Sequence, residues 1–203
     1  MFLRKRKSEP PLLHTRFQAA LAYAARLHVA QVRKGTRIPY LAHLLGVCAL
    51  VVEAGGDEDE AIGALLHDAI EDQPRGGKTA PEIKRKFGDH VLEIVMALTD
   101  AETHPKRPWI DRKRDYIARA RTHTAAARRV SLADKLHNTR AILADYREIG
   151  EVVWERFSAS RDDVLWYYRS LVEAYADADD NGRLHEELAR VVDELDRVVG
   201  AGR

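Results

Sequence analysis

The sequence predicts an all-α protein with a single domain of about eight to ten helices. Apolar residues recur at helical spacing along most of the chain, and no segment shows the sustained two-residue alternation of a half-buried strand. Apolar residues form 45% of the 203 residues, enough for a substantial core and consistent with one domain. No linker or internal repeat divides the chain. We expect a flexible basic N-terminus at residues 1–12 and the folded domain at residues 13–199.

The first part of the chain is predicted to form three helices. The first is followed by a basic loop, Gln31 to Tyr40, which Pro39 closes; the second ends at Gly55-Gly56, and the third runs from about Glu58 to Asp72. Apolar positions at i, i+3 and i+4 define one face of each helix. These faces are, in order, Phe17, Leu21, Ala24, Ala25 and His28; His43, Val47, Leu50, Val51 and Ala54; and Ile62, Leu65, Leu66 and Ala69.

The remaining elements are also predicted to be helical. Thr79 and Glu82 have the spacing of a capping box with Pro81 in the first turn, which predicts a short helix that stops at Gly88. A helix at 89–99 follows, and then the polar stretch 100–108, which holds two prolines and is predicted to be a mobile loop. Further helices are predicted at about 109–121, 124–146, 148–156, 160–178 and 182–199.

Composition excludes several classes of protein. The net charge of +1 argues against a dedicated nucleic-acid binder, and the single cysteine, Cys48, excludes an intramolecular disulfide framework or a CxxC zinc site. The sequence contains no apolar window of membrane-spanning length, and the N-terminus lacks the apolar region of a secretion signal. The basic run at residues 4–7 is expected to be solvated. We therefore expect a cytoplasmic protein with no nucleic-acid or membrane partner.

The first candidate site is the end of the predicted third helix. His67 and Glu71 are four residues apart, as are Asp68 and Asp72, so that the four ionisable side chains project from adjoining faces. The helix macrodipole disfavours three carboxylates at a C-terminus, so this placement indicates a cation nearby. An exposed acidic helix end is the alternative interpretation.

Two further positions add candidate ligands to this segment. Asp134 lies in a mostly apolar stretch, where a lone carboxylate is costly, and Asn138 is one turn further along the same face. His43 lies on the apolar face of the second helix, where a histidine is often a satisfied core residue; His28 has the same ambiguity. Together, His43, His67, Asp68 and Asp134 would form a nitrogen–oxygen ligand set suited to Mn²⁺, Fe²⁺, Zn²⁺ or Mg²⁺.

These residues carry a resemblance to a known family. The order of His43, His67-Asp68 and Asp134 is similar to that of the HD-domain metal-dependent phosphohydrolases. More narrowly, the chain resembles the hydrolase domain of the RelA/SpoT family in its stand-alone form, the small alarmone hydrolases, from about residue 14 to 196. The matching blocks are Ala25 to Gly35, Ile38 to His43, Leu65 to Asp72 and Ala133 to Asn138.

The resemblance implies an all-helical domain that holds one Mn²⁺ through His43, His67, Asp68 and Asp134. It implies hydrolysis of the 3′-pyrophosphate of guanosine tetra- or pentaphosphate to GDP or GTP and pyrophosphate. It also implies that Glu71 and Asp72 position the attacking water. The residues that it implies for binding the nucleotide are Arg33, Lys34 and Asn138. Lys113 and Arg161 are added as phosphate contacts on charge and place alone.

Three positions depart from the family pattern: Ala30, Leu44 and Gln73 stand where the family usually has glycine, proline and threonine. None of them removes a ligand or the acidic pair. A different HD nucleotide phosphohydrolase, a 5′-nucleotidase or an NADPH phosphatase, is the alternative function, and a degenerate HD domain that only binds is a third. The Arg33-Lys34-Gly35 loop and Glu71-Asp72 favour the alarmone hydrolase. No pattern in the sequence indicates an oligomeric state.

Overall fold

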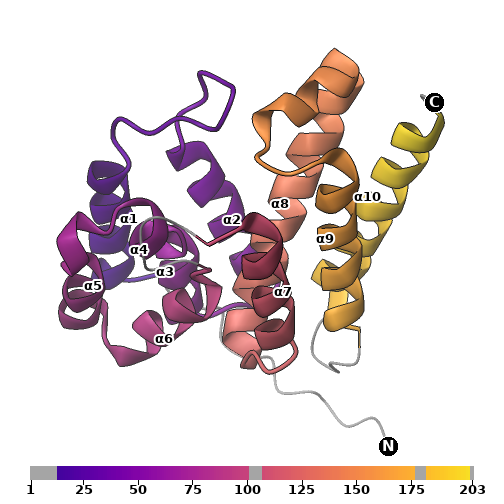
Figure 1. Ribbon diagram of the computed structural model, residues 1–203. Coiled ribbons are helices and arrows are strands. Elements are labelled where there is room, and N and C mark those ends of the chain that lie inside the picture. Colours follow the sequence, from indigo (N-terminus) through magenta and orange to yellow (C-terminus); the bar gives the residue numbers. More distant parts are fainter. Residues whose placement is uncertain (1–12, 101–106, 177–181, 202–203) are drawn as a thin grey trace, which may run out of the picture.

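The computed structural model describes residues 13–100, 107–176 and 182–201. This part of the chain is all-helical, with one isolated β-bridge in a loop, which confirms the predicted fold class (Figure 1). The predicted flexible terminus at residues 1–12 and residues 101–106 of the predicted mobile loop lie outside the described residues. The α-helices are α1 (Thr15–Leu27), α2 (Leu41–Glu53), α3 (Glu58–Leu66), α4 (Ala69–Asp72), α5 (Thr79–Phe87), α6 (Asp89–Leu98), α7 (Trp109–Ala120), α8 (Ala125–Ile149), α9 (Arg161–Ala174) and α10 (Gly182–Ala201), and the 3₁₀ helices are η1 (Arg75–Gly77) and η2 (Gly150–Arg156).

The long helix α8 is the central element. It packs against α2, α3 and α6, which lie with α1, α4 and α5 on the left of Figure 1, and against α10 and η2 on the right. Residues 130–134 of α8 are all buried, so this stretch is enclosed on every face rather than along one stripe. A polar side chain here, such as that of Asp134, therefore requires a partner inside the protein. None of the described helices has the length and apolar character needed to cross a bilayer.

The prediction that Glu58 to Asp72 forms one continuous helix is wrong. α3 ends at Leu66, and α4 begins at Ala69, with Asp68 between them at φ −96° and ψ 0°. The His67 ring explains the break, because its Nδ1 donates a hydrogen bond of 2.8 Å to the carbonyl of Ala64. That carbonyl is the one that the N–H of Asp68 would need in a continuous helix, so the side chain competes with the helical hydrogen bond.

The predicted capping box at Thr79 is also wrong, although α5 spans the predicted residues. Thr79 is inside the helix, and its hydroxyl donates to the carbonyl of Gln73. A capping box occurs instead at α3, where the N–H of Glu60 donates to Asp57 Oδ1 at 3.0 Å and the N–H of Asp57 donates to Glu60 Oε2 at 2.7 Å. α3 is thereby fixed at the end opposite to His67.

Removing this cap is expected to destabilise the protein. Asp57→Ala should lower the free energy of unfolding by about 1 kcal/mol, because the N–H of Glu60 loses its acceptor. Asp57→Asn is the matched control, since an asparagine oxygen accepts the same hydrogen bond. Urea unfolding followed by circular dichroism measures both variants. An equal loss in the two variants would contradict the capping role.

The C-terminal helices differ from the prediction mainly at their ends. α8 continues to Ile149, three residues past its predicted end, and Gly150 with φ +61° ends it. The predicted helix at 148–156 is a 3₁₀ helix, η2, which starts at that glycine. α9 ends at Ala174, four residues before its predicted end. The turn at Gly150 brings η2 back along α8, where it forms one wall of a cavity described below.

Candidate metal centre and adjoining cavities

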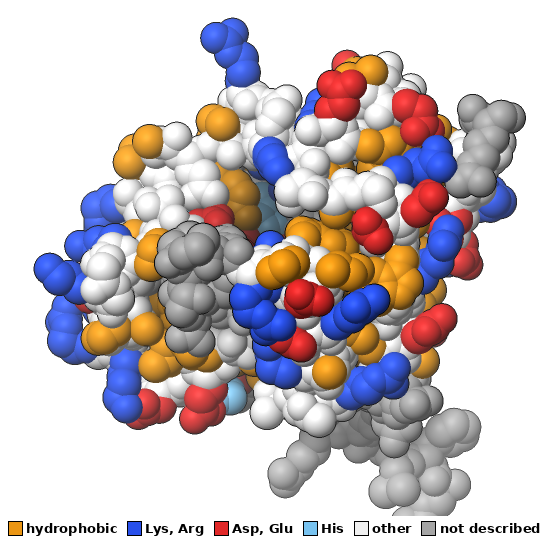
Figure 2. Space-filling model, in the orientation of Figure 1, with side chains coloured by type: hydrophobic (Ala, Val, Ile, Leu, Met, Phe, Trp, Pro, Cys, Tyr) orange, Lys and Arg blue, Asp and Glu red, His pale blue; other side chains and the backbone are white. Residues whose placement is uncertain are grey.

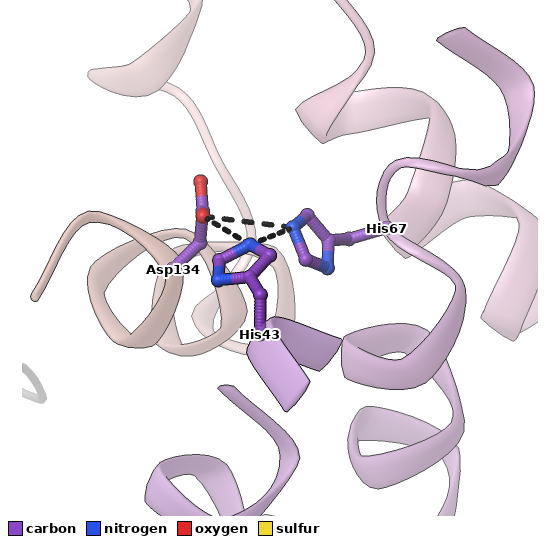
Figure 3. Close-up of side chains that lie close together, drawn as sticks. All are labelled: His43, His67 and Asp134. Atoms are coloured by element: carbon purple, nitrogen blue, oxygen red, sulfur yellow. Dashed lines mark hydrogen bonds and ion pairs between the residues drawn. The ribbon is translucent and has the colours of Figure 1, made fainter. Parts of the chain in front are cut away.

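Two histidines and one aspartate, two of them on helices and one directly after a third helix, converge in the core (Figure 3). His43 lies in the first turn of α2, His67 directly follows α3, and Asp134 lies in α8. His43 Nε2 is 3.3 Å from His67 Nε2 and 3.2 Å from Asp134 Oδ1, and His67 Nε2 is 3.5 Å from the same oxygen. All three residues are at most 4% exposed. The three atoms therefore face one another at the spacing of ligands around a metal ion.

Asp68, the fourth residue predicted as a ligand, lies beside this cluster. Its Oδ2 is 2.9 Å from His67 Nε2 and 3.7 Å from His43 Nε2. The helix break puts it there, because Asp68 occupies the turn between α3 and α4. The hydroxyl of Tyr40 donates to the same Oδ2. The structure thus brings the four predicted ligands together, and two imidazoles with two carboxylates are a donor set that fits a divalent ion such as Mn²⁺, Fe²⁺ or Zn²⁺.

Neighbouring groups orient the candidate ligands. Because His67 Nδ1 donates to the Ala64 carbonyl, Nε2 is the nitrogen that faces the cluster. Lys135 Nζ pairs with Asp134 Oδ2, so that the other oxygen, Oδ1, points towards the histidines. Asn138 Nδ2 donates to that Oδ1 at 2.6 Å. Such outer contacts fix ligand geometry before an ion binds.

The electrostatics of the cluster favour a cation. Burial acts to raise the pKa of the Asp134 carboxyl, but the Lys135 charge and the contacts with His43 and His67 outweigh it and hold that pKa well below its usual range. At His67 burial acts to lower the pKa, but Asp68 and Asp134 raise it well above its ordinary value. The two carboxylates therefore stabilise a positive charge at the point where His67 Nε2 lies. A divalent ion would replace that proton, since metal binding and protonation compete for the same lone pair.

The acidic pair Glu71 and Asp72 lines a cavity of about 200 Å³ on the side of Asp68 and Asp134. Gln31 holds Asp72, because its Nε2 donates to Asp72 Oδ2 at 2.7 Å. The orientation of the Gln31 amide is determined by its oxygen, which accepts from His28 Nδ1 at 2.7 Å and from Gln73 Nε2 at 3.0 Å. The sequence did not decide whether His28 is a core residue or a ligand; in the structure it belongs to this hydrogen-bond chain.

A second cavity, of about 240 Å³, adjoins the first, and the two share Tyr40 and Asn138 as lining residues. The loop of residues 31–40, at the top of Figure 1, forms one wall and η2 the opposite wall. This loop is a short hairpin, with the N–H of Arg33 donating to the carbonyl of Ile38 at 2.9 Å. The lining residues of this cavity are Arg33, Lys34, Thr36, Tyr40, Asn138, Ala141, Ile142, Asp145, Val153, Arg156, Phe157 and Tyr168.

Glycine is required at position 35 of the loop. Gly35 has φ +72°, and a Cβ there would lie 2.6 Å from Cγ of Arg156, whose side chain crosses the loop and pairs with Asp145. Arg33 NH2 donates to Asn138 Oδ1 at 3.2 Å, so the loop is joined to α8 as well.

Figure 2 shows a hollow near the centre of the face in view, with histidine in its depth and Lys or Arg side chains nearby.

The two residues predicted from charge and place alone differ in position. Lys113 lines the cavity of the acidic pair, where its Nζ pairs with Asp100 and lies 4.9 Å from the centre of the Tyr167 ring. Arg161 instead begins α9 and pairs with Asp162 at 3.0 Å and Glu151 at 3.4 Å. It is not among the described residues that line either cavity. The structure therefore groups Lys113, but not Arg161, with the other candidate residues.

Sequence reasoning missed several residues that the structure adds to the site. Tyr40, Lys135 and Gln31 contact Asp68, Asp134 and Asp72, respectively. His137 contacts a candidate ligand as well: its Nδ1 is 3.0 Å from His43 Nδ1, and burial together with the neighbouring His43 lowers the pKa of His137 to about 4. For Lys135 a signal exists in the sequence, since a lysine beside a buried aspartate is the nearest available counter-charge.

Comparison with known proteins identifies the family of the chain. The model of the HD domain matches residues 20–165, and the chain therefore belongs to the HD-domain family. Within that family it is similar to proteins named guanosine-3′,5′-bis(diphosphate) 3′-pyrophosphohydrolase MESH1. The one from Xenopus tropicalis is 40% identical over 124 residues, and the human one is 37% identical over 124 residues; each alignment covers 60% of this chain and 66% of the relative. The chain thus spans about two thirds of the length of these relatives.

A solved structure is similar over nearly the whole chain. It is described as a metazoan ortholog of SpoT that hydrolyzes ppGpp and plays a role in starvation responses. The TM-score is 0.73 at 29% sequence identity, and the match covers 92% of this chain and 97% of the other. The resemblance seen in the sequence is therefore confirmed at the level of the family and the fold.

Proposed function

We propose that this protein removes the 3′-pyrophosphate of guanosine tetra- or pentaphosphate, giving GDP or GTP and pyrophosphate, with one Mn²⁺ held by His43, His67, Asp68 and Asp134. The observation that carries the proposal is the pair of adjoining cavities. One is lined by three of the four candidate ligands, His67, Asp68 and Asp134, and by the acidic pair, and the other is lined by the cationic 31–40 loop and by apolar and aromatic residues. The activity stated in the names of the similar proteins supports it.

The proposed reaction is an attack of water on the phosphorus bonded to the 3′ oxygen. A new P–O bond forms, the bond to the 3′ oxygen breaks, and that oxygen takes up a proton. A divalent ion bound at the centre supplies two effects: it lowers the pKa of water and offsets the charge of phosphate oxygens. We assign the water to Glu71 and Asp72, whose carboxylates can orient it and accept its proton. The Gln31 amide would keep Asp72 in place for this step.

Binding of the substrate is assigned to the residues around the shared wall of the cavities. Arg33 would contact the phosphates or stack on the purine, since a planar guanidinium can do both, and the Lys34 ammonium would contact the phosphates. Asn138 would contact the ribose side, because it lies between Arg33 and Asp134. Lys113 would neutralise phosphate charge in the cavity of the acidic pair. Positioning and charge neutralisation are what phosphoryl transfer chiefly requires.

The proposal is tested with a panel of substrates. Purified protein with Mn²⁺ is incubated separately with ppGpp, pppGpp, NADPH and nucleoside monophosphates, and anion-exchange chromatography and ³¹P NMR identify the products. We expect pyrophosphate with GDP or GTP from the first two. Release of inorganic phosphate from NADPH or from a monophosphate, with ppGpp intact, would favour the alternative HD phosphohydrolase. The cytoplasmic location stays a prediction from the sequence.

Arg33→Ala is expected to weaken substrate binding more than it slows turnover. The loss should be about 1–3 kcal/mol and appear mainly in KM for ppGpp, because one charge-assisted contact is removed and Glu71 and Asp72 are untouched. Arg37→Ala is the matched control, since Arg37 is an exposed arginine of the same loop. Steady-state kinetics at saturating Mn²⁺ measure both variants. An unchanged KM for Arg33→Ala would remove this residue from the substrate site.

A further inference from the structure

We propose that His137 is a positioning residue that fixes the ring proton of His43 on Nδ1, so that Nε2 of His43 presents its lone pair to the metal centre. The inference rests on the proposed function only in so far as it needs His43 to be a metal ligand. His137 lies inside the matching block Ala133 to Asn138, but the resemblance gives it no role. The support for the inference comes from one contact and from the packing that holds it.

Only one proton fits between the two ring nitrogens that are in contact. His43 Nδ1 and His137 Nδ1 are 3.0 Å apart, so one nitrogen donates the hydrogen bond and the other accepts it. The other nitrogen of His43, Nε2, faces His67 Nε2 and Asp134 Oδ1. A metal ion at that point needs an unprotonated Nε2, and neutral His43 then carries its proton on Nδ1. His137 must therefore accept through its own Nδ1.

This arrangement differs from the one at His67. There a backbone carbonyl, that of Ala64, accepts the proton from Nδ1, and a carbonyl can only accept. At His43 the acceptor is a second imidazole, which can present either a lone pair or a proton. The tautomer of His137 therefore decides which nitrogen of His43 carries the proton and which one presents a lone pair to the metal centre.

The packing of α2 on α8 holds His137 in this position. Gly46 lies one turn after His43 on the same face of α2, and a Cβ at residue 46 would lie 2.4 Å from Cδ2 and Nε2 of the His137 ring. A glycine inside a helix costs roughly 0.5–1 kcal/mol relative to alanine, so its presence here requires a reason. We infer that Gly46 makes room for the ring, which His43 contacts edge-on with 4.8 Å between ring centres.

Two variants of nearly equal shape test the role. Asparagine puts an oxygen acceptor close to the place of His137 Nδ1, whereas leucine fills the same volume without an acceptor. We expect His137→Leu to raise the Kd for Mn²⁺ by about 10- to 100-fold, the usual effect of losing an outer-shell partner of a ligand. His137→Asn should stay close to the wild type. Calorimetric titration of the full chain with Mn²⁺ measures both, without substrate.

A purely structural role predicts the opposite order. Leucine is a better helix former than asparagine and the site is partly buried in α8, so stability alone would favour His137→Leu. Equal Mn²⁺ affinity in the two variants, or tighter binding by His137→Leu, would overturn the proposal. If wild-type protein binds no Mn²⁺, the proposed function fails first, and this inference fails with it.

The tautomer itself can be observed by NMR. In ¹⁵N-histidine-labelled protein loaded with Zn²⁺, which is diamagnetic, long-range ¹H–¹⁵N spectra should show a proton on Nδ1 of His43 and a lone pair on Nδ1 of His137. The reverse assignment would overturn the proposal. Gly46→Ala supplies a second variant, in case His137→Leu does not fold. It should weaken Mn²⁺ binding by displacing the His137 ring, and unchanged binding would overturn the proposal.

Discussion

The double variant His67→Ala/Asp68→Ala is expected to lose the divalent ion and all measurable hydrolysis. Both side chains reach the same point: Asp68 Oδ2 lies 2.9 Å from His67 Nε2. Removing them leaves one imidazole and one carboxylate, so affinity for Mn²⁺ should fall by more than about 100-fold, beyond the cost of losing an outer-shell partner. Metal analysis after dialysis against Mn²⁺ measures the content per chain, and wild-type protein should hold up to one ion.

A matched control exists on α6. Asp89→Ala/His90→Ala removes an adjacent aspartate and histidine whose side chains are 68% and 51% exposed, far more than the candidate ligands. This variant should keep the metal and the activity of the wild type. Equal metal content in all three proteins would show that His67 and Asp68 are not ligands, and the proposed metal centre would have to be abandoned.

Glu71→Gln and Asp72→Asn should each retain the metal and yet lower kcat by a factor of about 10² or more, the usual scale for a positioned acid–base group. Neither residue is proposed as a ligand, and both line the cavity next to Asp68 and Asp134. An amide keeps the size of the carboxylate but cannot accept a proton from water. Single-turnover kinetics with ppGpp, combined with metal analysis of each variant, separate the chemical step from metal loss.

The corresponding control is Glu93→Gln, at an exposed acidic residue of α6. It changes the net charge by the same amount and should leave kcat unchanged. Near-wild-type turnover of Glu71→Gln or Asp72→Asn would mean that the residue concerned is only part of an acidic helix end, which is the alternative interpretation of this segment.

Helical periodicity was sufficient to predict the fold class and the positions of most helices. α1, α2, α5 and α6 lie where the apolar spacing and the glycines at 55 and 88 put them. The break between α3 and α4 was missed, because the stripe of apolar residues continues through it. What ends α3 is the hydrogen bond from a side chain, His67, to a backbone carbonyl, and helical spacing contains no information on that contact.

For the site, the sequence named the four candidate ligands, and the structure brings them within reach of one another. It also named Arg33, Lys34 and Asn138, which line one cavity together. Arg161 was chosen from its charge and its place in the sequence alone, and the structure pairs it elsewhere. Gln31 and His137 were missed as site residues because their contacts depend on the path of the 31–40 loop and on the packing of α2 against α8, both of which are tertiary.

The wide spacing of the candidate ligands along the chain has a consequence for folding. His43, His67 and Asp68 belong to the first half, whereas Asp134 arrives only with α8, and pairings over long sequence distances form late. During synthesis the proposed ion would therefore have no complete site until α8 has emerged and packed. An Mn²⁺ ion that bound this site in the native state and not in the unfolded chain would raise the free energy of unfolding by RT ln(1 + [Mn²⁺]/Kd), about 2.7 kcal/mol at an ion concentration of 100 times Kd. The metal supply of the cell would then set how long this chain survives proteolysis, as well as whether it can act.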